Sequence, residues 1–316
     1  MEAPEISVVM GAYNGSLLLR ESVDSILSQE GVQFELIIVD DGSTDDTKNI
    51  LSQYADRDAR IRVITQENQG LTRALIKGCA AAQGEYIARQ DVGDISHPCR
   101  LYLQKEALDA NQELAFVSCW TEFCGPQWEF LYLVKGTGLA ATPVNIISET
   151  EKNGTIDGPT CHPSVMFRAE TYARAGGYRA EFRWGQDWDL WHRLAELGKF
   201  QTLEQSLYRA RLLPDSISSY NKHLQTAIGD LSIAALRRRT QRLSEEDVLE
   251  RAGKIQPNRR SKQSARRRAE WFYFIGECLR RNQDSRSTAY FVRSIRINPL
   301  KVESWLRLFQ AWFRTR

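Results

Sequence analysis

The 316-residue sequence has no long apolar run and few cysteines. No stretch approaches the roughly 20 apolar residues that a helix needs to cross a bilayer, and the N-terminus lacks the basic and then apolar pattern of a signal peptide. We therefore expect a cytoplasmic protein. Its six cysteines are scattered without a C-x-x-C pair, which favours reduced thiols over a disulfide framework or a zinc site.

Charge is divided unequally along the chain, although the total is only +2. Residues 250–316 contain 17 Lys and Arg against 5 Asp and Glu, a net charge of +12, which leaves −10 for residues 1–249. Such a basic segment is either a solvated helical face or a surface for an anionic membrane, a nucleic acid or an acidic partner. The length and mixed composition favour one large domain with an appendage.

Short apolar runs alternate with segments of helical spacing through the first part of the chain. The runs predict strands at residues 6–10, 34–39, 60–65, 86–89, 114–121 and 165–168. Helices are predicted between them, and this alternation indicates an α/β fold with a mainly parallel central sheet and flanking helices. Residues 125–158 are rich in Gly and Pro, and we expect loops there, on the acceptor side of the molecule.

Polar side chains follow three of these strands at the point where each strand ends. They come in pairs after the first, second and fourth strands: Tyr13 and Asn14, Asp40 and Asp41, and Asp91 and Asp94. A parallel sheet collects such strand ends along one edge, where an aromatic ring can stack on a base and carboxylates can bind a ribose or a cation held on diphosphate. We therefore predict a nucleotide site. Taken alone, the turn with Asp91 and Asp94 could equally be an acidic surface turn.

A second informative motif is GQDWDLWHRL, residues 185–194. The aromatic and apolar residues at 188, 191 and 194 share one helical face, which places Asp187 in the first turn of a helix. A carboxylate there stabilises the helix by about 0.3–1 kcal/mol. Asp189 points to another face, and we expect it to form a structural ion pair.

The runs GAYN, LIIVDDGSTDDT, NQGLTRAL and GEYIARQDVGD, with ISHPCRL after the last, resemble the inverting family 2 glycosyltransferases of GT-A fold over about residues 5–220. The resemblance implies that Tyr13 and Asp40 contact the base of a nucleotide-diphospho-sugar donor. It further implies that Asp41 and its loop flank the nucleoside, and that Asp91 lies by the sugar diphosphate. Asn14, Gly70 and Arg209 complete the expected donor-binding residues.

The resemblance also gives Asp187 a catalytic role. Its motif matches the family's E-D-Y-D-L-W-x-R-L segment, whose aspartate deprotonates the acceptor hydroxyl, with Gln186 in place of the glutamate. Inverting transfer needs one base opposite the leaving diphosphate, which favours the base over a helix-terminal charge.

The expected metal site departs from the family. In place of D-x-D-D the chain has Asp91-Val92-Gly93-Asp94, so glycine replaces the acid that commonly binds the metal. Three alternatives follow. Asp94 binds the metal together with Asp91, or Asp91 and phosphate oxygens alone hold Mg²⁺ or Mn²⁺, or activity is lost. His162 is a further metal or phosphate candidate, although a lone histidine is more often structural. The family's usual histidine before the closing S-x-S segment, here residues 216–218, is missing.

We expect a catalytic domain over residues 1–222 and a basic helical region over 223–316. One segment of that region, AYFVRSIRINP, looks like part of a tetratricopeptide repeat; a single copy cannot stack, so its helices should pack on the catalytic domain or on a second protomer of a homo-oligomer. Arginines there alternate with aromatic residues, namely Trp271, Phe272, Tyr273, Trp305 and Trp312. This pattern predicts peripheral contact with the inner face of a membrane, with no nucleic-acid binding.

The predicted function is transfer of a sugar from a nucleotide-diphosphate donor to a saccharide or lipid-linked acceptor in polysaccharide biosynthesis. A catalytically impaired sugar-nucleotide-binding or scaffold protein is the alternative that Gly93 and Gln186 keep open. A nucleotidyltransferase is disfavoured because no basic glycine-rich phosphate loop occurs early in the chain.

Overall fold

The computed structural model describes residues 3–136, 158–214, 222–255 and 264–314. The chain forms two compact units: Met1–Thr121, Val134–Ala210 and Leu224–Gln256 make the first, and Glu122–Leu133, Arg211–His223 and Pro257–Arg316 the second. This division differs from a domain boundary at residue 222. Much of the expected acceptor-side segment, residues 137–157, and the S-x-S segment, residues 216–218, lie outside the described residues.

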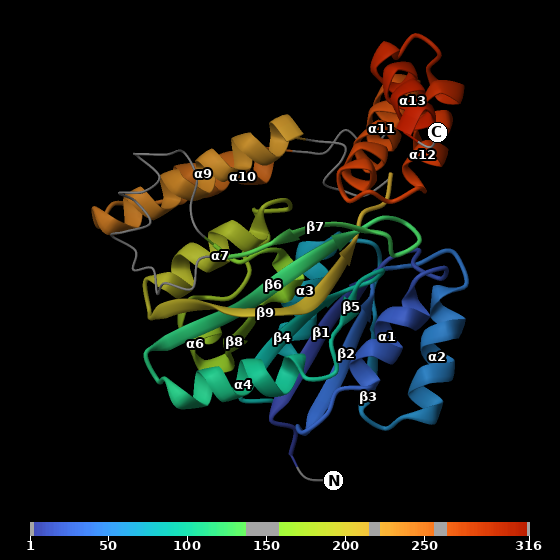
Figure 1. Ribbon diagram of the computed structural model, residues 1–316. Helices are drawn as coiled ribbons and strands as arrows, with labels where there is room; N and C mark the ends of the chain where they lie inside the picture. The colour runs from blue at the N-terminus through green and yellow to red at the C-terminus, as the bar shows by residue number, and fades with distance from the viewer. Residues whose placement is uncertain (1–2, 137–157, 215–221, 256–263, 315–316) are drawn as a thin grey trace. The chain divides into compact units, whose positions relative to one another are not determined.

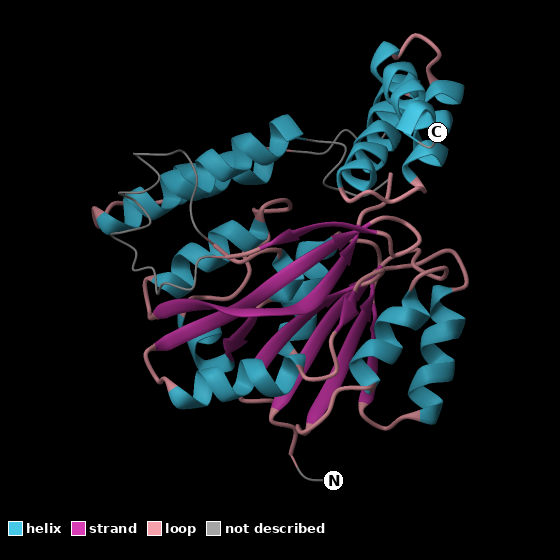
Figure 2. Cartoon of the chain, in the orientation of Figure 1, coloured by secondary structure: helices cyan, strands magenta, loops and turns pink. Residues whose placement is uncertain are grey.

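Four parallel strands form the first half of the central sheet (Figures 1 and 2). In sheet order these are β3 (Ile61–Thr65), β2 (Phe34–Asp40), β1 (Ile6–Ala12) and β4 (Tyr86–Asp91). The helices α1 (Leu19–Leu27), α2 (Thr47–Arg57) and α3 (Leu71–Ala80) alternate with them along the chain. Both faces of β1 and β2 are buried, which explains their nearly continuous apolar sequences. The predicted α/β fold is confirmed.

The other half of the sheet is antiparallel where its pairing is defined. The order continues from β4 through β8 (Met166–Arg168), β6 (Leu114–Cys124) and β9 (Lys199–Arg211) to β5 (Ile95–Ser96), and β7 (Phe130–Val134) pairs with β6. The pairs β4 with β8, β8 with β6, and β9 with β5 are antiparallel. The sheet is therefore mixed, and the expected parallel arrangement holds for the half that carries the predicted nucleotide site.

Several helices complete the first unit. They are α4 (Arg100–Ala110), the 3-10 helix η1 (His162–Ser164), α6 (Ala169–Arg174), α7 (Gln186–Ala195), α9 (Lys222–Thr240) and α10 (Glu246–Lys254). Apolar residues of α9 and α10, among them Ile228 and Val248, share a buried cluster with Phe182, which lies just before α7. This burial is why the first unit extends beyond residue 222.

The second unit contains α11 (Ala265–Arg281), α12 (Ser287–Ile297) and α13 (Val302–Arg314). Trp271 and Phe272 of α11 pack against its buried apolar cluster, and Tyr273 lies against Phe291 of α12. The sequence pattern had placed these three aromatic residues on a docking surface, but the structure places them between packed elements. The three side chains are packed because α11 buries this side against α12 and β7.

No helix among the described residues is both long enough and apolar enough to cross a bilayer.

Candidate active site

The strand ends that the sequence singled out lie side by side. In the parallel register, Ala12 of β1 is opposite Asp40 of β2, and Gly11 is opposite Asp91 of β4. Tyr13 follows β1 directly, and 53% of its surface is exposed, so its ring is accessible to a planar ligand. The structure thus brings Tyr13, Asp40 and Asp91 to one edge of the sheet, as predicted.

Asp40 is buried, with 1% of its surface exposed. Its Oδ1 accepts a hydrogen bond from the backbone N–H of Ser43 at 3.0 Å, which fixes the start of the loop after β2. A fixed and mostly shielded carboxylate of this kind can recognise a base N–H with little competition from water.

Asn14 joins the loop after β1 to the loop after β2. Its side-chain oxygen accepts hydrogen bonds from the backbone N–H groups of Thr44 at 2.8 Å and Asp45 at 3.3 Å. The backbone N–H of Asn14 donates to Ser43 Oγ at 3.0 Å. Asn14 adopts a positive φ of 50°, which asparagine tolerates better than most residues. These contacts hold the two loops together, while a contact of Asn14 with the donor stays a prediction.

Asp41 organises the loop before α3. Its carboxylate accepts hydrogen bonds from Gln66 Nε2 at 2.7 Å and from the backbone N–H groups of Gln69 and Gly70, each at 2.8 Å. Gly70 has φ +90°, a conformation that glycine adopts without strain. Both residues therefore shape the edge of the site through this loop, and the position of the Asp41 loop beside a nucleoside stays a prediction.

Arg89, which the sequence analysis did not single out, holds Asp91 in place. The guanidinium is fully buried in β4 and donates to Asp91 Oδ1 at 2.6 Å and to the carbonyl of Val9 at 2.6 Å. Burial is the largest single effect on the pKa of Arg89 and lowers it, but the nearby acidic groups, of which Asp91 acts most strongly, together raise it above the usual value. The Asp91 side chain keeps 34% exposure. The signal in the sequence was an arginine directly after the apolar residues 86–88 of this strand.

Asp94 is less accessible than Asp91. It is 9% exposed, and its Oδ2 accepts a hydrogen bond from Tyr208 Oη of β9 at 3.0 Å. The same phenol oxygen accepts the backbone N–H of Asp91 at 3.3 Å. Tyr208 thus fixes the turn between β4 and β5, and Arg209, the next residue of β9, lies opposite Ile95 of β5. A diphosphate contact of Arg209 stays a prediction.

The turn is built around glycine at position 93. Gly93 has φ +100°, and its N–H donates to Ser22 Oγ at 2.8 Å. An added Cβ would lie 3.3 Å from Leu18 Cδ1, in a backbone conformation that other residues rarely adopt. The family's usual aspartate therefore does not fit this turn as it stands.

The donor set around this turn fits a weakly held divalent cation better than a closed metal cage. Within the described ranges, no three His, Cys, Asp or Glu side chains are grouped to hold a metal. Asp91 offers a partly exposed carboxylate, whereas Asp94 is buried and bonded to Tyr208. Mg²⁺ commonly keeps water and substrate phosphates as ligands beside one or two carboxylates, so Asp91 together with a diphosphate suits it.

Asp187 lies in the first turn of α7, as predicted. Its carboxylate is half-buried and accepts the backbone N–H of Trp188 at 3.0 Å. Burial raises its pKa to about 6; the charge of Asp91 adds to this rise, while the Trp188 N–H and Arg89 oppose it. Asp187 and Asp91 are therefore close enough to interact. A carboxylate with a pKa near neutrality, beside a candidate diphosphate site, suits a general base.

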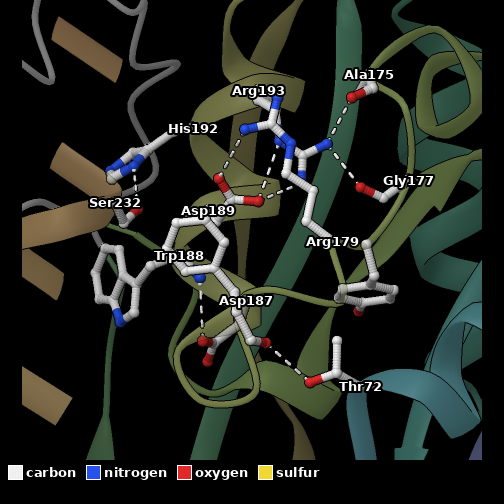
Figure 3. A network of polar contacts seen from close by, with 12 residues as sticks. Thr72, Ala175, Gly177, Arg179, Asp187, Trp188, Asp189, His192, Arg193 and Ser232 are labelled. Atoms are coloured by element: carbon white, nitrogen blue, oxygen red, sulfur yellow. Dashed lines mark hydrogen bonds and ion pairs between the residues drawn. The ribbon is translucent and has the colours of Figure 1, made fainter. Parts of the chain in front are cut away.

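Asp189 forms the structural ion pair that the sequence predicted, on another side of α7 from Asp187 (Figure 3). It is 1% exposed, and its Oδ2 accepts from Arg193 Nη2 at 2.5 Å. Arg193 Nη1 also donates to the carbonyls of Ala175 and Gly177 at 2.5 and 2.6 Å. The pair fixes α7 to the segment after α6.

Charged contacts continue from α7 to the helices that follow β9. Arg179, whose Nη1 lies 3.7 Å from Asp189, makes two hydrogen bonds to Glu245 at 2.8 and 2.7 Å. Arg239 of α9 bonds Glu245 at 2.8 Å and Glu196 at 2.6 Å. Because Glu245 directly precedes α10, α9 and α10 both brace the region that carries Asp187.

His162 has a structural environment. Its Nε2 lies 2.7 Å from Tyr178 Oη, and its ring meets Trp191 edge to face. Burial, and then the charge of Arg89, lowers its pKa well below the usual value, so the ring stays neutral. This favours the structural interpretation over a metal or phosphate contact.

Comparison with known proteins points to one family. The model of glycosyl transferase family 2 matches residues 7–169. EpsE of Bacillus subtilis (strain 168), provisionally named a glycosyltransferase, is 35% identical over 66% of this chain and 73% of its own length. A chondroitin synthase of Pasteurella multocida (strain Pm70) is 26% identical over 70% of this chain but only 22% of its own length.

The fold agrees with that of a solved protein. The crystal structure of S. aureus TarS in complex with UDP matches with a TM-score of 0.51 and 17% identity, over 99% of this chain and 92% of that one. The same protein has also been solved with UDP-GlcNAc.

Proposed function

Because the chain belongs to glycosyl transferase family 2 and is a glycosyltransferase, we propose that it transfers a sugar from a nucleotide-diphosphate donor. The transfer proceeds with inversion, and Asp187 is the base. The observation that carries the proposal is the half-buried Asp187 carboxylate, whose pKa is raised to about 6 beside Asp91. A base matched to neutral pH and a diphosphate-binding edge are the two parts that such a displacement requires.

The donor binds with its base at Tyr13 and Asp40 and its diphosphate near Asp91. The exposed Tyr13 ring and the buried Asp40 carboxylate support this orientation, since one can stack on a base and the other can accept its N–H. The UDP complex of TarS, a protein of the same fold, supports a nucleoside diphosphate as the ligand class. Asp41, Asn14 and Gly70 shape the loops around it.

In the transfer step, the acceptor hydroxyl gives its proton to the Asp187 carboxylate as its oxygen bonds to the anomeric carbon. The bond from that carbon to the diphosphate breaks on the opposite face, and its electron pair leaves with the nucleoside diphosphate. Arg89 keeps Asp91 oriented, and Arg209 is a candidate partner of the leaving phosphate. A divalent cation held by Asp91 and the phosphates would neutralise the charge of the leaving group.

For the acceptor, we propose a saccharide or a lipid-linked saccharide, met at the inner face of a membrane. The similarity to a chondroitin synthase supports a role in polysaccharide synthesis. The basic residues of the C-terminal region support peripheral contact with anionic lipid.

Asp40→Ala should weaken binding of a nucleoside diphosphate by about tenfold or more, since one charge-assisted hydrogen bond contributes about 1.5–3 kcal/mol. Calorimetry with uridine, guanosine and thymidine diphosphates, each with Mg²⁺ and Mn²⁺, measures this. Asp46→Ala is the matched control because it removes an exposed carboxylate from the same loop. The donor-site assignment fails if the parent binds none of the three. Donor binding without any transfer would instead favour the impaired sugar-nucleotide-binding protein.

The rate of transfer should rise with pH through a midpoint at or above 6, because Asp187 accepts a proton only when it is ionised. A bound diphosphate adds negative charge nearby and shifts this midpoint upward. Transfer at saturating donor, measured from mildly acidic to mildly basic pH, gives the profile. His162 does not titrate in this window because its pKa is lowered well below the usual value. A rate independent of pH across the window would argue against Asp187 as the base.

A further inference from the structure

The outward face of α13 is apolar. Val302, Trp305, Leu306 and Phe309 are exposed by 71, 51, 53 and 59%, and Leu300 in the preceding turn by 88%. Positions three and four apart lie on one side of a helix, so the four residues of α13 form a continuous stripe. We call these five residues the α13 face.

The opposite side of α13 is polar and packed. Ser304 is fully buried, and its hydroxyl lies 2.8 Å from that of Ser294 in α12. Arg307 Nε lies 3.1 Å from Glu277 Oε2 of α11. A surface helix normally buries its apolar side, but α13 leaves this apolar stripe exposed. Exposed apolar patches of this kind mark interaction surfaces.

The helices that carry the α13 face are basic in composition. Residues 264–310 contain 10 Lys and Arg against 4 Asp and Glu, a net charge of +6. Each of the four acids already lies against a cation within this unit: Glu270 with Arg266, Glu277 with Arg280, Asp284 with Arg286, and Glu303 with Lys301. The excess positive charge is therefore not balanced by acids within residues 264–310.

We propose that α13 lies in the plane of an anionic lipid surface, with the α13 face among the acyl chains and the arginines of α11 and α12 near the headgroups. A second copy of this chain would bring the same positive charge to the contact and be repelled, whereas anionic lipid complements both the charge and the apolar face. A tryptophan among aliphatic residues is typical of this depth in a bilayer. The proposal rests on the peripheral location proposed above and not on the chemistry of transfer.

Flotation of the full chain with lipid vesicles tests whether α13 binds anionic lipid. The vesicles contain phosphatidylcholine alone or an equal mixture with phosphatidylglycerol. The parent should float with the mixed vesicles, and raised salt should reduce its recovery. Phe309→Glu and Phe309→Gln should each weaken binding by about tenfold or more, because each removes a large apolar side chain from the contact. Gln310→Glu, which adds the same charge one residue away, should change recovery far less.

The result is separable from the proposed function. Phe309 belongs to the second compact unit, so its variants should bind nucleoside diphosphate with the parental affinity, and their melting temperatures report any loss of stability. Equal flotation of the parent with the two vesicle types, or of Phe309→Glu with the parent, would overturn the proposal. A dimer in sedimentation that Phe309→Glu dissolves and Gln310→Glu does not would assign the α13 face to a second copy instead.

Discussion

Asp187→Asn is expected to lower the rate of sugar transfer by about 10²–10⁴-fold while leaving donor affinity nearly unchanged. The amide keeps the size of the side chain but cannot accept the acceptor's proton. Transfer assays at saturating donor, with calorimetry of donor binding, measure the two effects separately. Glu181→Gln is the control, because it makes the same kind of change at an exposed acid shortly before α7.

The same variant separates a base from a helix-terminal charge. If Asp187 only stabilised the N-terminus of α7, its replacement would cost about 0.3–1 kcal/mol of stability and leave transfer intact. Folding raises the pKa of Asp187 to about 6. Ionised Asp187 therefore lowers the free energy of unfolding. This loss grows as the pH rises from the pKa of the unfolded chain through that of the folded protein. At pH above 6 the neutral Asn should therefore not lower the melting temperature. Transfer near the parental rate would remove the catalytic assignment.

Asp189→Asn is expected to destabilise the fold by about 3–5 kcal/mol, because it leaves Arg193 buried without its anionic partner. The two side chains are 1% and 3% exposed, and their atoms are 2.5 Å apart. Denaturation in urea, followed by far-ultraviolet circular dichroism, gives the difference in unfolding free energy.

A second ion pair four residues apart provides the comparison for Asp189. Glu250 and Lys254 of α10 also lie 2.5 Å apart, but their side chains are 65% and 71% exposed. Glu250→Gln should cost no more than about 1 kcal/mol, since exposed pairs are screened by water. Equal losses in the two variants would mean that burial of the Asp189 pair contributes nothing.

The parallel half of the sheet could be predicted because its strands are mostly apolar and are followed by short polar turns or loops. The strands β5, β7 and β9 were not predicted. In β9 the exposed Glu204 and Gln205 interrupt the apolar pattern, and its place in the sheet depends on pairing with strands distant in sequence. Strand formation of that kind is decided by tertiary contacts and not by local preference.

The positions of the strand-end residues could also be predicted, but not all of their contacts. Asp41 accepts a hydrogen bond from Gly70, and Arg89 forms an ion pair with Asp91. Both contacts depend on segments that only folding brings together. Likewise, the aromatic residues of the last helices were visible in the sequence. Which of them faces solvent was decided by the side on which each helix packs, so Trp271 is packed and Trp305 is exposed.

The contacts of Glu245 limit how this chain can be divided or recombined. Because Glu245 bonds both Arg179 and Arg239, a chain ended between α9 and α10 would lose an anion shared by two arginines, and a chain ended at residue 222 would also expose the apolar cluster around Phe182. Exchange of segments with relatives, in evolution or in the laboratory, should therefore fail at these two points. The helices α9 and α10 would be inherited together with the catalytic unit.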